Sequence, residues 1–347
     1  MNDGSVGSSL TGFPDQVRDA IAIGRAFAPR ATRPVSRVVV CGMGGSGIGG
    51  ALVAAWASRE GGRTPIVLHH DYGLPSFVDD STLVVALSYS GDTEETLTAF
   101  ELAGSRGAAR LAVTTGGKLA ARAQAASVDV VALPKGFQPR AAAGYLTIPL
   151  AFALSKWGAV PDPGASCKAA LAAVAELAPA LTPDAPADKN EARAIAQALV
   201  GRIAVCYGLG PYAIAARRFA NELSENGKVL AFHGAIPEIC HNDLVGWSGD
   251  DASRVALAIV TGPEAGRANE ERARFMETVA RERGAAVARL AASGGDFLAN
   301  LFSVVYLGDW TSYYLARLRN VDPTPVEVIG RLKSELSRLG TIESWKP

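Results

Sequence analysis

The sequence predicts an α/β protein with two doubly wound parallel sheets in tandem and helices at its C-terminal end. Apolar runs rich in Val, Ile and Leu alternate with Ala-rich helical stretches, as strands and covering helices do in parallel sheets. The chain has 347 residues, which suits about two domains of ~150 residues each. The second half also repeats the order of apolar and helical runs of the first half, which indicates a degenerate internal duplication.

Breaks in these patterns divide the chain into five segments. Pro- and Asp-rich stretches such as VPDPGAS and LTPDAPAD mark a connection between the two sheet domains. The segments that we expect are an N-terminal helical segment (1–34), a first sheet domain (35–155), a helical connection (156–195), a second sheet domain (196–320) and a C-terminal helix (321–347).

Apolar runs give the strands that we expect, and amphipathic runs give the helices between them. The expected strands are 37–42, 65–70, 81–90, 109–115 and 128–134 in the first domain, and 202–208, 254–262 and 285–292 in the second. Helices are expected at 47–60 and 93–107, and the last strongly helical stretches are 300–320 and 326–339. Five strands suffice for one doubly wound sheet in the first domain.

The charge balance excludes a general attraction to nucleic acid or to an anionic membrane. Lys and Arg total 34, and Asp and Glu also total 34, so any anion must be held locally. The N-terminal stretch lacks the basic and apolar order of a signal peptide, and apolar runs such as YLTIPLAFAL are too short to span a bilayer. The four cysteines are dispersed, which favours reduced thiols and no structural zinc. We therefore expect a cytoplasmic protein.

A glycine-rich loop follows the first expected strand in the stretch GMGGSGIGG. Gly42, Gly44 and Gly47 fit the GxGxxG pattern of dinucleotide sites, and Asp71 follows the next strand, where a ribose-binding carboxylate would stand. The GxGxxG pattern alone is weak evidence for a dinucleotide site. A nicotinamide enzyme is one interpretation, and a single phosphate held by the loop is the other.

A second loop, LSYSGDTEETL, favours the single phosphate. Ser88, Ser90 and Thr93 lie where the third expected strand gives way to a helix, so hydroxyls, free amides and the positive end of a helix dipole meet there. The plain alternative is that Ser90 or Asp92 caps the helix. In an open parallel sheet both loops lie at the carboxyl ends of strands. The expected phosphate-binding residues are Gly44, Gly45, Ser46, Ser88, Ser90 and Thr93.

The SxSGxT loop after GMGGSGIGG is similar to the phosphosugar-binding loops of the sugar isomerase (SIS) domain, which has a flavodoxin-like fold. With the stretch ELSENGKVLAFHGAIPEICHNDLVGW, the chain resembles the bifunctional phosphoglucose/phosphomannose isomerases of archaea and bacteria over residues 35 to 340. The resemblance implies interconversion of glucose 6-phosphate or mannose 6-phosphate with fructose 6-phosphate through a cis-enediol. It also implies an obligate homodimer in which a His enters the site from the neighbouring subunit. We expect no cofactor and no metal.

The same resemblance assigns the proton-transfer residues. Glu225 matches the base that moves a proton between C2 and C1, and a partly desolvated carboxylate has a pKa suited to that task. Glu222, three residues earlier on the same helix face, is the residue most easily confused with it. His241 in CHND matches the ring-opening His, with His233 as the nearby alternative. Gly227 is expected to loosen the turn after Glu225.

Two positively charged residues complete the set of expected catalytic residues. Arg140, in LPKGFQPRAAAG, matches the family Arg near the C1 and C2 oxygens, where a permanent positive charge stabilises the enediolate. Lys135 is its close neighbour. Lys333 matches a C-terminal Lys that contacts substrate, although it lies beside an apolar stripe and could instead extend from a buried helix face.

A protein of another class also fits the loops, because SIS domains serve as sugar-phosphate sensors in transcription regulators. Such regulators carry a helix-turn-helix segment, and fewer than forty residues precede the first expected strand here. We therefore expect an enzyme. A sensor would bind fructose 6-phosphate without exchanging its C1 or C2 hydrogens.

Overall fold

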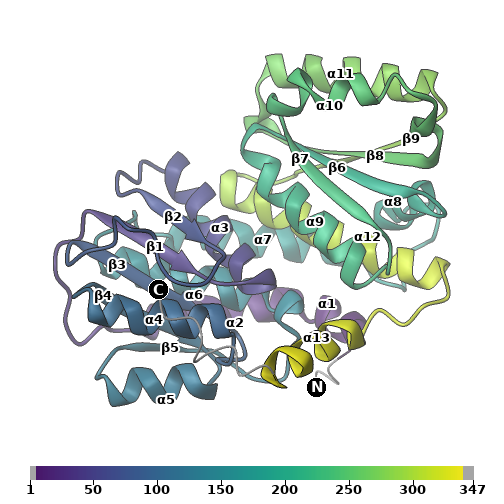
Figure 1. Ribbon diagram of the computed structural model, residues 1–347. Helices are drawn as coiled ribbons and strands as arrows, with labels where there is room; N and C mark the ends of the chain where they lie inside the picture. Colours follow the sequence, from purple (N-terminus) through teal and green to yellow (C-terminus); the bar gives the residue numbers. More distant parts are fainter. Residues whose placement is uncertain (1–4, 339–347) are drawn as a thin grey trace. The chain divides into compact units, whose positions relative to one another are not determined.

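The structure is a computed structural model that describes residues 5–338 (Figure 1). The chain forms two compact units. The first contains Asp15–Ala165 and residues 325–338, and the second contains Ser5–Pro14 and Ser166–Thr324. Each unit is built around one parallel sheet.

The first unit holds a five-stranded parallel sheet in the order β2-β1-β3-β4-β5. Its strands are β1 (Arg37–Cys41), β2 (Ile66–His69), β3 (Thr82–Leu87), β4 (Ala109–Thr114) and β5 (Val130–Ala132). Its helices are α2 (Phe13–Ala26), α3 (Gly44–Arg59), α4 (Glu94–Ser105), α5 (Gly117–Ala125), α6 (Ala143–Lys156) and α13 (Glu327–Arg338). The five strands and the doubly wound class are as predicted.

Alternate residues of these strands face opposite helical layers. On one face, Val39 and Val84 pack with Ala99 of α4, and Ala86 packs with Leu119 of α5. On the other face, Val40 lies so close to α3 that a Cβ at Gly50 would be 2.6 Å from its Cγ1. The β-branched runs therefore bury both faces of the sheet, as parallel sheets require.

The second unit holds a four-stranded parallel sheet in the order β7-β6-β8-β9. This order repeats the β2-β1-β3-β4 part of the first sheet, in agreement with the expected duplication. Its strands are β6 (Ile203–Leu209), β7 (Ala231–Ile236), β8 (Val255–Thr261) and β9 (Ala286–Ala291). The strand β7 was not among the predicted strands.

Helices cover both faces of the second sheet. Figure 1 shows α11 on one side, and α8, α9 and α12 on the other. The helices of this unit are α1 (Val6–Thr11), α7 (Gly164–Leu181, which starts two residues before the boundary), α8 (Glu191–Leu199), α9 (Ala213–Glu225), α10 (Asp243–Gly246), α11 (Arg267–Glu282) and α12 (Phe297–Leu318). Short 3₁₀ turns are η2 (Gly210–Tyr212), η3 (Glu238–His241), η4 (Asp250–Arg254) and η5 (Pro263–Ala265).

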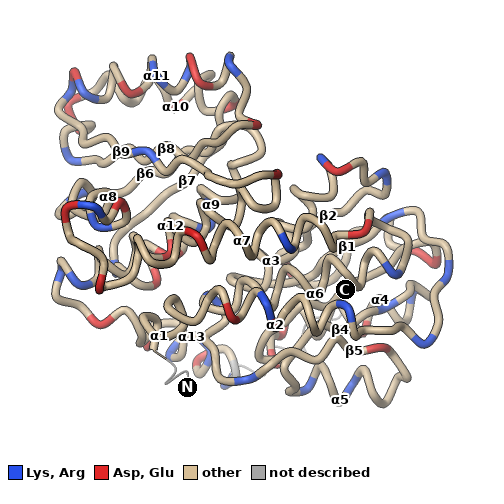
Figure 2. Tube along the Cα trace, turned by 180° about the vertical axis from the view of Figure 1, so that it is seen from behind, with Lys and Arg blue, Asp and Glu red and all other residues tan. Residues whose placement is uncertain are grey.

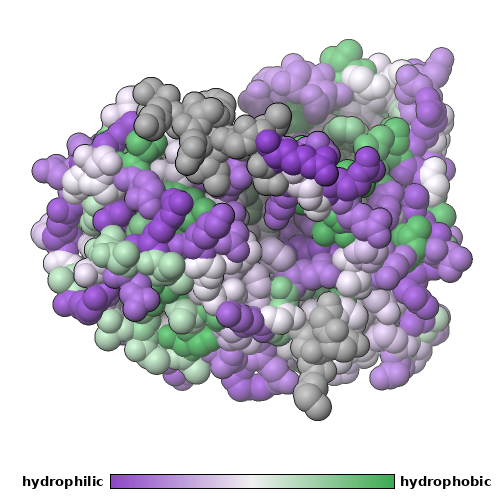
Figure 3. Space-filling model, turned by 60° about the horizontal axis from the view of Figure 1, so that its bottom comes forward, coloured by the Kyte–Doolittle hydropathy of each residue, from purple (hydrophilic) through white to green (hydrophobic). Residues whose placement is uncertain are grey.

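Charged and apolar residues are distributed as the sequence composition suggests. Figure 2 shows charged residues of both signs along the outer helix α11, whereas the strands carry few. Figure 3 shows apolar side chains scattered among hydrophilic ones on the face that it presents. Among the described helices, α7 is long and apolar enough to cross a membrane. Core helices of soluble proteins can have the same length and composition, so this property of α7 is weak evidence for a membrane span.

The cysteines are free thiols in the structure. Cys41, Cys167 and Cys206 are buried, and Cys240 is partly exposed. Burial raises the pKa of the Cys41 thiol to about 12, and a thiol that stays protonated is a poor nucleophile. These buried cysteines therefore serve as small apolar core residues.

Candidate functional site

A hydrogen bond joins the two expected phosphate loops in the first unit. Ser46 follows β1 and is 5% exposed, and its Oγ accepts a hydrogen bond of 3.1 Å from the backbone N–H of Tyr89 after β3. The strands β1 and β3 are parallel neighbours, so their carboxyl ends lie at one edge of the sheet. The structure thus brings the glycine loop and the hydroxyl loop together.

The hydroxyl loop is a compact cluster. Ser88 is 1% exposed, and its Oγ lies 2.9 Å from Thr93 Oγ1 and accepts a 3.1 Å hydrogen bond from the N–H of Gly91. Ser90 is exposed, and its Oγ accepts from the N–H of Asp92 at 3.2 Å. Three of the hydroxyls expected at the site therefore border one short loop.

The expected alternative, a side-chain cap on α4, is wrong. The N-cap residue is Thr93, whose side chain makes no capping hydrogen bond. Ser90 Oγ accepts from the N–H of Asp92 within its own turn, and Asp92 Oδ1 accepts from the N–H of Lys118 on α5. The first-turn amides of α4 are thus not used by a side-chain cap, and such amides with a helix dipole suit an oxyanion.

The glycine loop is shorter than the sequence indicated, because α3 begins at Gly44 rather than at residue 47. Gly44 has φ +52, a conformation that favours glycine. A Cβ at Gly45 would stand 2.8 Å from the carbonyl carbon and oxygen of Pro139 and 2.9 Å from the N of Arg140. Gly45 is therefore needed for close backbone contact with the segment that carries Arg140.

This contact places Arg140 beside the loops of the first unit. Arg140 lies in a 3₁₀ turn, η1 (Pro139–Ala141), and is 3% exposed. Lys135, its neighbour in sequence, is exposed and lies near Gly116. The two cations therefore differ in burial, and Arg140 is the buried one.

His70 belongs to the same edge of the sheet, and sequence reasoning did not select it. It follows β2, and its Nδ1 is 2.7 Å from the carbonyl oxygen of Gly42. A Cβ at Gly47 would lie 2.9 Å from His70 Cε1. The ring therefore packs against the glycine turn. Its position directly after a strand that neighbours β1 was the available signal.

In the second unit, Glu225 and Glu222 have different environments. Glu225 is the last residue of α9 and is half-buried. Glu222 is 4% exposed, and its carboxylate lies 3.3 Å from Arg218 Nη2. A carboxylate that is buried and paired with a guanidinium is engaged in a charge-assisted contact inside the fold. Glu225, in contrast, is partly accessible to solvent.

The structure does not bring Glu225 and His241 together within one chain. Glu225 ends the helix before β7, and His241 ends η3, which follows β7. A strand of six residues spans about 20 Å at ~3.3 Å per residue. His241 is exposed at the far end. His233, inside β7, has a pKa lowered by partial burial and by the charge of Arg217.

Lys333 lies on an exposed helix. It belongs to α13 in the first unit, and Val328, Ile329 and Leu332 of that helix are 76%, 42% and 59% exposed. The alternative that Lys333 extends from a buried apolar face is therefore wrong. The apolar stripe of α13 is open to solvent in the single chain.

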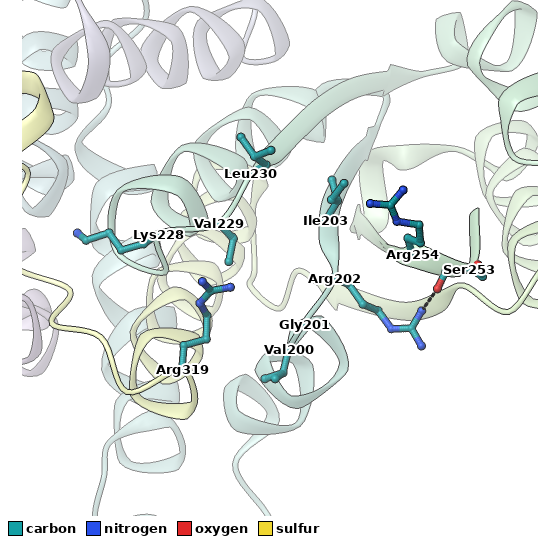
Figure 4. Close-up of a pocket in the computed structure, with 10 residues that line it drawn as sticks. All are labelled: Val200, Gly201, Arg202, Ile203, Lys228, Val229, Leu230, Ser253, Arg254 and Arg319. Atoms are coloured by element: carbon teal, nitrogen blue, oxygen red, sulfur yellow. Dashed lines mark hydrogen bonds between the residues drawn. The ribbon is translucent and has the colours of Figure 1, made fainter. Parts of the chain in front are cut away.

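A cavity of about 620 Å³ lies at the amino-terminal edge of the second sheet (Figure 4). Lys228 and Leu230, which follow Glu225 closely in the chain, contribute to its wall. Figure 4 shows Arg202 turned to the backbone of Ser253, with a hydrogen bond of 2.6 Å to its carbonyl oxygen. The cavity and Glu225 are at the amino-terminal end of β7, and His241 is at the carboxyl-terminal end.

Neither loop of the first unit gathers metal ligands. Among residues 5–338, no group of three or more His, Cys, Asp and Glu side chains is placed to hold a metal ion. The two loops of the first unit bring together hydroxyls and backbone amides, and the backbone of Arg140 lies beside Gly45. These groups suit an anion with several oxygens, such as a phosphate monoester.

Two doubly wound sheets in tandem, with hydroxyl-rich loops on the first, define a pair of SIS domains. Residues 33–153 match the SIS domain family, and residues 188–336 match the bacterial phospho-glucose isomerase C-terminal SIS domain. A solved structure of a hypothetical protein from Thermus thermophilus has the same fold, with a TM-score of 0.74 and 19% identity. The match covers 97% of this chain and 90% of that one.

Similarity to sequence relatives extends along nearly the whole chain. The bifunctional phosphoglucose/phosphomannose isomerase of Caldicellulosiruptor bescii is 33% identical over 335 residues, which cover 95% of this chain and 98% of that protein. The protein of the same name from Aquifex aeolicus is 34% identical over 306 residues, which cover 88% and 92%. The chain belongs to the bifunctional phosphoglucose/phosphomannose isomerase family.

Proposed function

We propose that this protein, as an aldose–ketose isomerase of phosphosugars, interconverts glucose 6-phosphate and mannose 6-phosphate with fructose 6-phosphate. The observation that carries the proposal is the Ser46–Tyr89 hydrogen bond, which joins two amide- and hydroxyl-rich loops next to the buried Arg140. The phosphate of the substrate would bind at these loops. Gly44, Gly45, Ser46, Ser88, Ser90 and Thr93 would supply the amides and hydroxyls.

Glu225 would transfer the proton between C2 and C1. Removal of the C2 proton of the open-chain aldose gives a cis-enediol, and return of the proton to C1 gives the ketose. A half-buried carboxylate at a helix end can approach the substrate and still be partly desolvated. The enediol has lost the configuration at C2 that distinguishes the two hexoses, so one carboxylate serves for both where the pocket lets either face of C2 meet it.

His241 and Arg140 would assist at the other stages. An imidazole can move a proton between O1 and O5 as the pyranose ring opens. The guanidinium of Arg140 keeps its charge and would stabilise the negative charge that develops on the enediolate oxygens. Lys333, which stands on the exposed helix α13, would contact the substrate near its ring or phosphate.

The protein would act as a cytoplasmic homodimer with shared sites. Glu225 lies at the amino-terminal end of β7 and His241 lies at its carboxyl-terminal end. A site that needs both residues would therefore take His241 from the partner subunit. An isologous dimer supplies two such sites by symmetry. The site would be incomplete in a monomer.

The direct test is to incubate the purified protein with glucose 6-phosphate and then with mannose 6-phosphate, and to follow fructose 6-phosphate by NMR. We expect turnover of both aldoses. Turnover of only one of the two aldoses would restrict the substrate to that aldose. Binding of fructose 6-phosphate without turnover of either aldose would instead identify a sensor and overturn the proposal.

A further inference from the structure

A buried ion pair joins the helix that carries Glu225 to the central helix of the second unit. Arg218 on α9 donates two hydrogen bonds to Asp309 on α12, of 3.1 Å from Nε to Oδ1 and 2.7 Å from Nη2 to Oδ2. The two residues are 2% and 3% exposed. Such a bidentate pair fixes distance and orientation together, so α9 has one defined position against α12.

Asn226, the residue directly after Glu225, extends this network. Its Nδ2 donates to Glu222 Oε2 and to Ser312 Oγ, both at 2.9 Å. The other oxygen of Glu222 lies 3.3 Å from Arg218. Ser312 in turn donates to the carbonyl oxygen of Asp309 at 2.7 Å. Asn226 therefore closes a ring of polar contacts between α9 and α12.

The next two residues are also restrained. A Cβ at Gly227 would lie 2.7 Å from the carbonyl oxygen of Leu223 and 3.1 Å from Leu315 Cδ2, so Gly227 packs tightly instead of loosening the turn as expected. Lys228 has φ +54, and its Nζ donates to the backbone carbonyl of Glu225. The backbone that follows Glu225 is thus held by side chains and by close packing.

Helix geometry separates the roles of the two neighbouring residues. Successive residues of an α-helix point about 100° apart. Asn226 is 1% exposed and directed to α12, whereas Glu225 is half-buried. A shift of about 1 Å in a reacting group can cost on the order of a hundredfold in rate. The contacts of Asn226 therefore bear on the position of the Glu225 carboxylate.

We propose that Asn226 is a positioning residue for Glu225, anchored through Glu222 and Ser312 to the Arg218–Asp309 pair. This inference rests on the proposed isomerase function. Asn226 does not contact the substrate, so its removal should slow proton transfer and leave substrate binding nearly unchanged. A residue with a merely structural role would change stability without this kinetic pattern.

The test compares Asn226→Ala with Asn190→Ala. Asn190 is also 1% exposed in the second unit, and its Nδ2 donates to Tyr314 on α12 at 3.2 Å, far from Glu225 in the chain. We expect kcat of Asn226→Ala to fall at least about tenfold, with KM within about twofold of the wild type. Asn190→Ala should lower the melting temperature to a similar extent and keep its kcat.

A second variant decides the case where Asn226→Ala does not fold. Ser312→Ala removes only the acceptor of Asn226 and the bond to Asp309, and should lower kcat by at least about threefold without raising KM. The proposal is overturned if the folded variants keep the kcat of Asn190→Ala, or if KM rises while kcat is unchanged. Failure of the wild type to isomerise either aldose would overturn the proposed function instead.

Discussion

Glu225 and His241 flank the same strand from opposite ends. Glu225 closes the helix before β7, and His241 lies in the 3₁₀ turn after it. Both belong to one rigid sheet unit, in which β7 pairs along its whole length with β6. Small side-chain movements therefore cannot join the two groups within one chain, and a site that uses both requires two chains.

This separation predicts complementation between inactive variants. Glu225→Gln and His241→Ala should each be nearly inactive alone. In a mixed dimer, one site receives both intact residues and the other receives neither. Random exchange of subunits should thus restore about a quarter of wild-type activity. The assay is a titration of one variant with the other after subunit exchange, and an equimolar mixture that stays inactive would contradict shared sites.

The hydroxyl loop predicts a binding defect on loss of Ser88. The Oγ of Ser88 is 2.9 Å from Thr93 Oγ1 and accepts from the N–H of Gly91, so Ser88→Ala should loosen the hydroxyl loop and, if this loop binds the phosphate, raise KM by about tenfold. The effect on kcat should be smaller, because the phosphate is remote from C1 and C2. Ser105→Ala on the exposed end of α4 is the control. Equal KM values for both variants would argue against a phosphate at this loop.

The ion pair predicts a large loss of stability. Asp309→Ala leaves the guanidinium of Arg218 buried, with Glu222 as its remaining carboxylate partner. Breaking a buried pair on one side costs about 3 kcal/mol of unfolding free energy. Denaturant unfolding measures this cost. Asp15→Ala, which removes the exposed partner of Arg18, should have little effect, and a similar small loss for Asp309→Ala would contradict the prediction.

The carboxylate of Glu270 on α11 predicts that the second unit loses stability in acid. Burial alone would raise the pKa of Glu270, but hydrogen bonds from Thr261 and Arg289 lower it below its ordinary value of 4.5. A group with a lowered folded pKa stabilises the fold above its unfolded pKa, and this contribution disappears as pH falls through the folded value. The unfolding free energies of wild type and Glu270→Gln should therefore converge as the pH falls below about 4.5. A difference independent of pH would contradict the assignment.

Strands with a marked apolar run could be predicted from the sequence, the edge strands β2, β5 and β9 among them, whereas the edge strand β7 could not. The continuous apolar runs of β3 and β8 predict them directly. In β7, Phe232 is 55% exposed, and Gly234 breaks the apolar pattern. Pairing with β6 on one side stabilises β7, and a local sequence pattern does not record that pairing.

The same division holds for the candidate site. The two loops could be predicted because parallel strands place their carboxyl ends at one edge of a sheet. The approach of Gly45 to Pro139 and the pairing of Arg218 with Asp309 join residues about ninety positions apart. Such contacts depend on how the layers pack, so Glu222 could be separated from Glu225 only in the structure.

In the proposed mechanism, the carboxylate of Glu225 carries the substrate proton between C2 and C1. Deuterium incorporation from heavy water into fructose 6-phosphate, followed by NMR for the wild type and for Glu225→Gln, tests this role. We predict rapid incorporation at C1 with the wild type, and none with the variant, which still binds fructose 6-phosphate. Incorporation at the wild-type rate in Glu225→Gln would contradict the claim.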